Sequence, residues 1–110
     1  MSAPTRWTRQ EWDEANLTLY VRSSGTCWWC ARPLRDTAVR HHRLRRREGG
    51  DSFQNLCLLH PTCHVEVHAQ PTRAKERGFI VPPWLAPLDV SIEVLGQRWF
   101  LDEEGGRARV

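Results

Sequence analysis

The stretch from residue 41 to residue 68 concentrates the side chains of this chain that could do acid–base or metal chemistry. It holds all five histidines, His41, His42, His60, His64 and His68, and two of the four cysteines. Imidazole exchanges a proton near neutral pH and is also a common metal ligand. Packing alone rarely gathers so many such groups in one short segment. We therefore expect a metal-dependent catalytic core here.

Two pairs of residues with equal spacing predict a second metal site. Cys27-Trp28-Trp29-Cys30 is a Cys-x-x-Cys pair, and His60-Pro61-Thr62-Cys63 has the same gap. Two such pairs facing each other supply a tetrahedral Cys3His set for a structural zinc. A redox role is the alternative, but it requires a long helix directly after the pair, and Pro33 and a basic segment follow instead. Cys57 remains the alternative fourth ligand in place of His60, although its apolar neighbours favour a buried core thiol.

Short elements must bring these groups together. Residues 37–42 are β-like and should form a strand that ends at the histidine pair, and residues 43–53 should form a turn-rich loop. Residues 56–59 form a second apolar strand, and Pro61 opens a helix that runs to about Ala69. His64 and His68 are four residues apart and therefore share one face of that helix. This order of strand, loop, strand and helix places four histidines near one another, enough to hold a cation and leave one imidazole as a base.

These residues resemble the HNH endonuclease family, in the form that carries a zinc-binding pair of knuckles around a ββα-metal finger. The matching segments are Cys27-x-x-Cys30, His41-His42-Arg43, Gly49-Gly50, Asn55-Leu56, Leu59-His60-x-x-Cys63-His64 and His68. Residues 71–84 also look like the small HNH proteins encoded by phages and prophages of actinobacteria. Two positions depart from the pattern: His60 stands where many relatives have cysteine, and Arg45 where many have proline.

The resemblance implies metal-dependent hydrolysis of phosphodiester bonds in DNA. It implies that His42 is the general base, that Asn55 ties the loop and orients this base, and that His41, His64 and His68 hold a catalytic divalent cation. Mg²⁺, Mn²⁺, Ni²⁺, Co²⁺ and Zn²⁺ are all compatible with such ligands. It also implies a role in phage packaging or homing, with a terminase as a partner. The rival interpretations are a zinc-stabilised DNA-binding or adaptor module without nuclease activity and a purely structural zinc ribbon, neither of which requires His42 and Asn55.

The charge is small overall but unevenly placed. Sixteen Lys and Arg against thirteen Asp and Glu give a net charge of +3, yet seven arginines lie between residues 32 and 47 with only Asp36 opposing them. A basic face beside a histidine cluster suits a phosphate backbone. We assign to DNA contact the arginines nearest the histidine pair, namely Arg40, Arg43, Arg45, Arg46 and Arg47.

Apolar segments are short throughout. No run approaches the roughly 20 apolar residues of a membrane-spanning helix, and the first residues lack the apolar core of a signal peptide. We therefore expect a cytoplasmic protein without membrane contact, located in the host cytoplasm if it is phage-encoded.

The sequence predicts one α+β domain over residues 1–110. Its finger, at about residues 27–70, is stapled by the structural zinc because a chain of this length builds only a thin core. Residues 1–26 should contain a helix that starts after Thr8, where Thr8 and Glu11 match a capping box, and ends near Val21. Residues 71–110 should cover the finger.

Within this covering segment we expect one or two helical turns before a Gly78 cap. Trp84, Leu85 and Leu88 should then pack over the finger. A hairpin of residues 91–95 and 98–101 should follow, with Gly96 at its first turn position, and the residues from Glu104 onward should be frayed.

Overall fold

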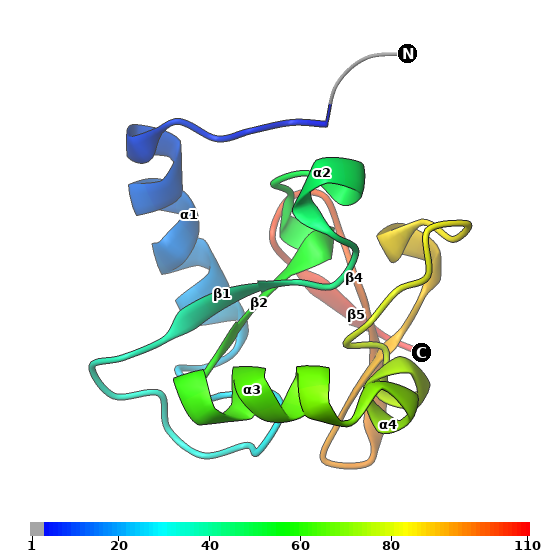
Figure 1. Ribbon diagram of the computed structural model, residues 1–110. Helices are drawn as coiled ribbons and strands as arrows, with labels where there is room; N and C mark the ends of the chain where they lie inside the picture. The colour runs from blue at the N-terminus through cyan, green and yellow to red at the C-terminus, as the bar shows by residue number, and fades with distance from the viewer. Residues whose placement is uncertain (1–3) are drawn as a thin grey trace.

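The computed structural model describes residues 4–110 and has the predicted α+β class. Figure 1 shows how its helices surround two small antiparallel sheets. In chain order the elements are α1 (Arg9–Arg22), β1 (Val39–His42), α2 (Arg46–Gly49), η1 (Phe53–Asn55), β2 (Leu56–Leu59), α3 (Pro61–Ala69), α4 (Pro71–Arg77), η2 (Pro87–Asp89), β3 (Ile92–Val94), β4 (Gln97–Leu101) and β5 (Arg107–Arg109). Within residues 4–110, none of the helices combines the length and apolar character needed to cross a lipid bilayer.

Helix α1 begins as the sequence predicts. The Thr8 side chain accepts a hydrogen bond from the Glu11 N–H, and the Glu11 carboxylate accepts one from the Thr8 N–H, which together form a capping box. Near the end of the helix, the buried Arg22 guanidinium donates to the carbonyl groups of Phe53 and Leu56. These bonds tie α1 to the residues that lead into β2.

The finger is built on the β1–β2 pair. The two strands are antiparallel, with His41 opposite Cys57 and His42 opposite Leu56. Figure 1 shows α3 lying along one side of the pair, while α2 and its loop rise on the other. Neighbouring residues of a strand point to opposite faces, so His41 and His42 are directed into different surroundings. The connection between the strands contains the single turn of α2, where the sequence predicted only a loop.

The C-terminal sheet is larger than the predicted hairpin. Strands β3 and β4 pair as expected, but β5 adds a third antiparallel strand over residues that we expected to be frayed. The Arg107 guanidinium lies 4.2 Å from the centroid of the Trp99 ring, and Asp102 accepts hydrogen bonds from the N–H groups of Glu104 and Gly106 in the turn that precedes β5. These contacts order the end of the chain.

The turn between β3 and β4 also differs from the expectation. Both Leu95 (φ 52°) and Gly96 (φ 77°) have positive φ, so Gly96 occupies the second turn position and not the first. Two successive positive φ angles are typical of the type I′ turn, whose twist matches that of a β-hairpin.

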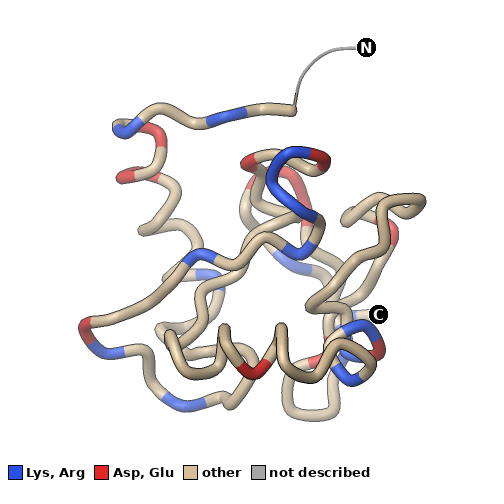
Figure 2. The backbone as a smooth tube through the Cα atoms, in the orientation of Figure 1, with Lys and Arg blue, Asp and Glu red and all other residues tan. Residues whose placement is uncertain are grey.

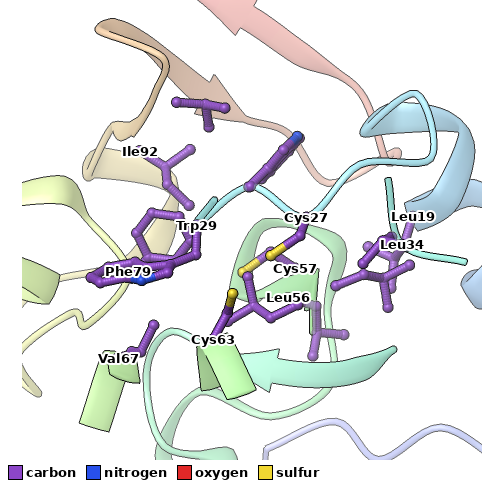
Figure 3. Close-up of a cluster of buried hydrophobic side chains, with 14 of the residues drawn as sticks. Leu19, Cys27, Trp29, Leu34, Leu56, Cys57, Cys63, Val67, Phe79 and Ile92 are labelled. Carbon is purple, nitrogen blue, oxygen red and sulfur yellow. The ribbon is translucent and has the colours of Figure 1, made fainter. Parts of the chain in front are cut away.

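The core gathers between α1, β2, α3 and the β3–β4 hairpin. Figure 3 shows its side chains, among them Leu19, Leu34, Leu56, Val67, Phe79 and Ile92, together with three cysteine thiols. The expectation that Trp84, Leu85 and Leu88 cover the finger is wrong, because all three are exposed. Phe79 and Val81 do so instead, and both are almost fully buried.

Candidate functional site

Four predicted zinc ligands come together between the first loop and the start of α3. One ligand atom from each of Cys27, Cys30, His60 and Cys63 lies within 4.8 Å of the others. His60 Nδ1 is 3.3 Å from Cys30 Sγ, and His60 Nε2 is 2.8 Å from the Pro33 carbonyl oxygen. Because a carbonyl only accepts, Nε2 carries the proton and Nδ1 turns its lone pair toward the thiols. A Cys3His set with a backbone carbonyl behind the histidine fits zinc.

The thiols of this cluster differ in acidity. Burial would raise the pKa of Cys30, but hydrogen bonds from Arg32 and from the Cys63 and Cys27 thiols outweigh it and lower this pKa to about 6. Burial, together with the neighbouring Cys27 and Cys30, raises the pKa of Cys63 to about 12. One thiolate therefore already forms near neutral pH, and a bound cation would favour deprotonation of the others. Cys57, the alternative ligand, lies outside this group, and burial within β2 raises its pKa to about 12.

A second group consists of histidines only. His41 from β1 and His64 and His68 from α3 each offer one ring nitrogen within 4.8 Å of the others. His68 Nε2 lies 3.3 Å from His64 Nε2. His41 Nε2 is 2.6 Å from the Phe79 carbonyl oxygen, so it must donate, and its buried Nδ1 has no hydrogen-bond partner within residues 4–110. An orphaned buried lone pair beside two further imidazoles fits a cation site, since a buried polar atom normally has a partner.

Burial also favours the neutral imidazole at two of these residues, His41 and His64. The pKa of His41 is lowered to about 4, chiefly by burial and also by the nearby histidines, against the opposing effect of the Phe79 carbonyl. Burial likewise lowers the pKa of His64. Neutral imidazole is the form that binds a metal ion.

His42 lies outside the histidine trio and is held by an aspartate. Its Nε2 is 2.9 Å from Asp51 Oδ1, and the Asp51 side chain is 0% exposed. Arg46 donates to both carboxylate oxygens at 3.0 Å, and the Trp7 N–H donates to Oδ2 at 2.9 Å. Burial would raise the pKa of Asp51, but these hydrogen bonds outweigh it and lower the pKa below its ordinary value. The ionised carboxylate only accepts, so His42 Nε2 carries the proton and Nδ1 keeps its lone pair.

The segment before α1 fastens this aspartate in place. The Asp51 N–H donates to the Thr5 carbonyl at 2.7 Å, which adds to the bond from the Trp7 N–H. Gly50 has φ 68°, and a Cβ atom there would lie 2.8 Å from the backbone N and O of Thr5. Only glycine allows the two segments to approach so closely.

Sequence reasoning missed Asp51 and the residues that support it. The available signal was an acidic residue directly after Gly49-Gly50, in the loop that connects the two strands of the finger. That signal gives no register between the loop and His42, and it contains nothing about Trp7, which lies 44 positions before Asp51. Only the folded chain brings these three residues together.

The Asn55 side chain holds the loop, and its hydrogen bonds go to Leu44 and Gly50 and not to His42. Its Oδ1 accepts from the Leu44 N–H at 2.7 Å, and its Nδ2 donates to the carbonyls of Leu44 at 2.8 Å and Gly50 at 3.0 Å. It thus fixes both ends of the segment that carries α2. The orientation of His42, which the family resemblance attributed to Asn55, comes from a direct bond to Asp51.

The base candidate and one of the three cation candidates line a common cavity. A hollow of about 370 Å³ is lined by His42 and His68, with Arg45, Lys75 and Trp84 also in its walls. The carboxylate of Glu48 also lies in these walls. A phosphodiester placed here would lie beside both kinds of imidazole, beside the cationic side chains of Arg45 and Lys75, and beside this one acidic side chain.

One of the arginines assigned to DNA cannot contact it. Arg43 is 2% exposed, and its guanidinium donates to four carbonyl groups, those of Gly78, Gln54, Pro87 and Val90. It holds the finger to the covering segment, so its assignment to DNA is corrected. Sequence reasoning did not separate it from its neighbours because a run of arginines does not reveal which side chain points inward.

The other four arginines are exposed. Arg45 and Arg47 flank the start of α2, where Figure 2 shows the basic run. The Arg40 guanidinium stacks 4.0 Å from the centroid of the Trp12 ring. Arg46 is 43% exposed and already forms the ion pair with Asp51, so it has a structural role beside any role toward a phosphate.

Comparison with known proteins is informative for the finger alone. Residues 27–70 match one family model, that of the HNH endonuclease. The matched segment contains every residue of both candidate metal groups as well as His42, Asp51 and Asn55. No curated protein and no solved structure matches the chain.

Proposed function

We propose that this chain, which carries a domain of the HNH endonuclease family over residues 27–70, is a metal-dependent endonuclease that hydrolyses phosphodiester bonds in DNA. The observation that carries this proposal is the shared cavity. His42, fixed by Asp51, faces the same hollow as His68 of the histidine trio. Hydrolysis requires a base for water and positive charge for the phosphate, and this cavity supplies the residues for both.

The base in this proposal is His42 Nδ1. It takes a proton from the attacking water, and the imidazolium that forms keeps its Nε2–H bond to Asp51. The negative charge of Asp51 stabilises this cation, and the buried geometry keeps the imidazole in the required tautomer. Asp51 therefore acts through His42 as a positioning residue, while Asn55 keeps the loop in its conformation.

His41, His64 and His68 would hold the divalent cation. When bound, the cation serves as a Lewis acid that neutralises charge on the phosphate and on the leaving 3′-oxygen. The Phe79 carbonyl fixes the tautomer of His41 and leaves its Nδ1 for coordination. Three imidazoles admit Mn²⁺, Co²⁺, Ni²⁺ or Zn²⁺ beside Mg²⁺.

A structural zinc held by Cys27, Cys30, His60 and Cys63 would stabilise the position of α3. Two of its ligands, His60 and Cys63, lie at the start of α3, the helix that also carries His64 and His68. The zinc would thus fix the end of α3 against the first loop.

A plasmid-nicking assay with single-residue variants tests the proposal. His42→Ala should reduce cleavage by about 10² to 10⁴ while cation binding stays intact, because His42 lies outside the trio. His41→Ala should instead weaken cation binding, measured by calorimetric titration with Mn²⁺. DNA binding without cleavage under any divalent cation would favour the alternative, a DNA-binding or adaptor module.

We propose the biological setting from sequence resemblance. A phage protein that acts in packaging or homing would meet DNA in the host cytoplasm, and a packaging role would place it beside a terminase. Co-purification with a terminase from infected cells would test this partner. Residues 4–110 of one chain offer one cavity lined by both His42 and His68, so cutting both strands would require two subunits or two successive visits.

A further inference from the structure

Trp84 presents its ring to solvent at the wall of the catalytic cavity. It is 79% exposed, and it lines the same hollow as His42 and His68. Arg45 and Lys75 lie in the same walls, together with one acidic residue, Glu48. A large aromatic side chain left in water beside two cations, at the proposed site of phosphate cleavage, indicates a surface that a ligand covers.

Hydrogen bonds hold the backbone before Trp84 to β1 and to the residue that follows it. The Leu85 N–H donates to the Pro82 carbonyl at 3.0 Å, which closes a β-turn with Pro83 and Trp84 at its centre. Proline at the first central position of such a turn restricts it further. Just before the turn, the Val81 N–H donates to the Arg43 carbonyl at 2.9 Å, and the Phe79 carbonyl accepts from His41.

These two anchors lie on either side of the base. His41 and Arg43 are the chain neighbours of His42. Because each of them is hydrogen-bonded to the segment before Trp84, the position of the turn is fixed relative to His42. The backbone that carries the Trp84 ring therefore has a defined place relative to His42. A surface tryptophan on a loose loop would not.

We propose that Trp84 is a stacking platform for an unpaired nucleobase next to the cleaved phosphate, an inference that rests on the proposed nuclease function. Within a continuous duplex each base is covered on both faces by its neighbours. An unpaired base offers a free π face, and stacking on an aromatic side chain is tolerant of sequence. The substrate class is therefore DNA that is single-stranded at the cut, such as a flap, a gap or a displaced strand.

The test measures binding in a cleavage-deficient background. Fluorescence anisotropy compares the zinc-loaded His42→Ala protein with its Trp84→Ala and Trp84→Phe derivatives, on a labelled single-stranded oligonucleotide and on the duplex of the same sequence. Trp84→Ala should weaken single-strand binding by about 5- to 150-fold and change duplex binding by less than about twofold. Trp84→Phe should keep most of the affinity. Leu95→Ala is the matched control, because Leu95 is 80% exposed and lies outside the cavity.

Several results would overturn the inference. These are equal losses on both DNAs, no loss on either, or no measurable binding of single strands by the His42→Ala protein. An unchanged affinity for both DNAs would point to a protein partner for the ring instead. The binding assay does not depend on catalysis, so a protein that binds single strands through Trp84 but never cleaves would refute only the nuclease function.

Discussion

Replacing Asp51 with asparagine is the sharpest perturbation of the proposed base, because it changes one atom. Four donors converge on the carboxylate: His42 Nε2 and Arg46 Nε reach Oδ1, and Arg46 Nη2 and the Trp7 N–H reach Oδ2. An amide has one accepting oxygen. In either orientation, two of the four donors would face an NH₂ group, and one of these two belongs to Arg46.

The cost of Asp51→Asn depends on which of the four donors can hydrogen-bond to water instead. Arg46 is 43% exposed and can turn toward water. If the amide NH₂ faces Trp7, the Trp7 N–H loses its acceptor and stays unsatisfied. That costs about 1–3 kcal/mol of folding free energy. If the amide NH₂ faces His42, the imidazole adopts the other tautomer and loses its free Nδ1. We expect cleavage to slow by about 10- to 100-fold, and by no more than the loss caused by His42→Ala, since Asp51 acts only through His42.

Single-turnover nicking of the single and double variants measures this dependence. The His42→Ala/Asp51→Asn double variant should cleave no more slowly than His42→Ala, because the orienting residue has nothing left to orient. Calorimetric Mn²⁺ binding should be unchanged in Asp51→Asn. Asp36→Asn, which removes an exposed carboxylate, is the matched control and should behave like the wild type. Multiplicative losses in the double variant, or a wild-type rate in Asp51→Asn, would refute the role given to Asp51.

Three further predictions concern the zinc, the DNA contacts and the pH dependence. Purified protein should hold about one tightly bound zinc, which His60→Ala should lose and Cys57→Ala should keep. Structural zinc contributes about 10–16 kcal/mol, comparable with the whole stability of a domain, so chelation should unfold the finger. An unchanged melting temperature after chelation would contradict the zinc site. Arg47→Ala should weaken DNA binding and reduce the slope of log affinity against log salt by about 1, as measured by anisotropy across salt concentrations. The lowered pKa of Asp51 means that its stabilisation is present above the ordinary carboxyl pKa of 3.8 and is lost as the pH falls through the lower folded-state value. Denaturation curves of wild type and Asp51→Asn should therefore differ at neutral pH and begin to converge only as the pH falls below 3.8, whereas a constant difference would contradict this.

Local spacing accounts for what the sequence alone determined. The gaps of Cys27-x-x-Cys30 and His60-x-x-Cys63 set two ligands on each short turn, and the four-residue gap between His64 and His68 sets both on one helical face. These are relations within single elements. The capping box that starts α1 and the proline that starts α3 are equally local. Such features were predictable because they depend only on neighbours in the chain.

Tertiary structure decided which side chains share a surface. Arg43 and Arg45 are two residues apart in one basic run, yet one is buried against four carbonyl groups and the other lies open in the cavity wall. Trp84 and Phe79 are both large aromatic residues, and the sequence does not distinguish their burial. Phe79 lies in the core, whereas Trp84, in the β-turn that follows Val81, is exposed.

The partner of the base was decided in the same way. Asp51 reaches His42 only because Gly50 lets the loop pass against the segment before α1, where the Trp7 N–H completes the carboxylate's hydrogen bonds. Burial and hydrogen bonding are properties of surroundings that distant parts of the chain assemble, and residue types and spacing do not contain them.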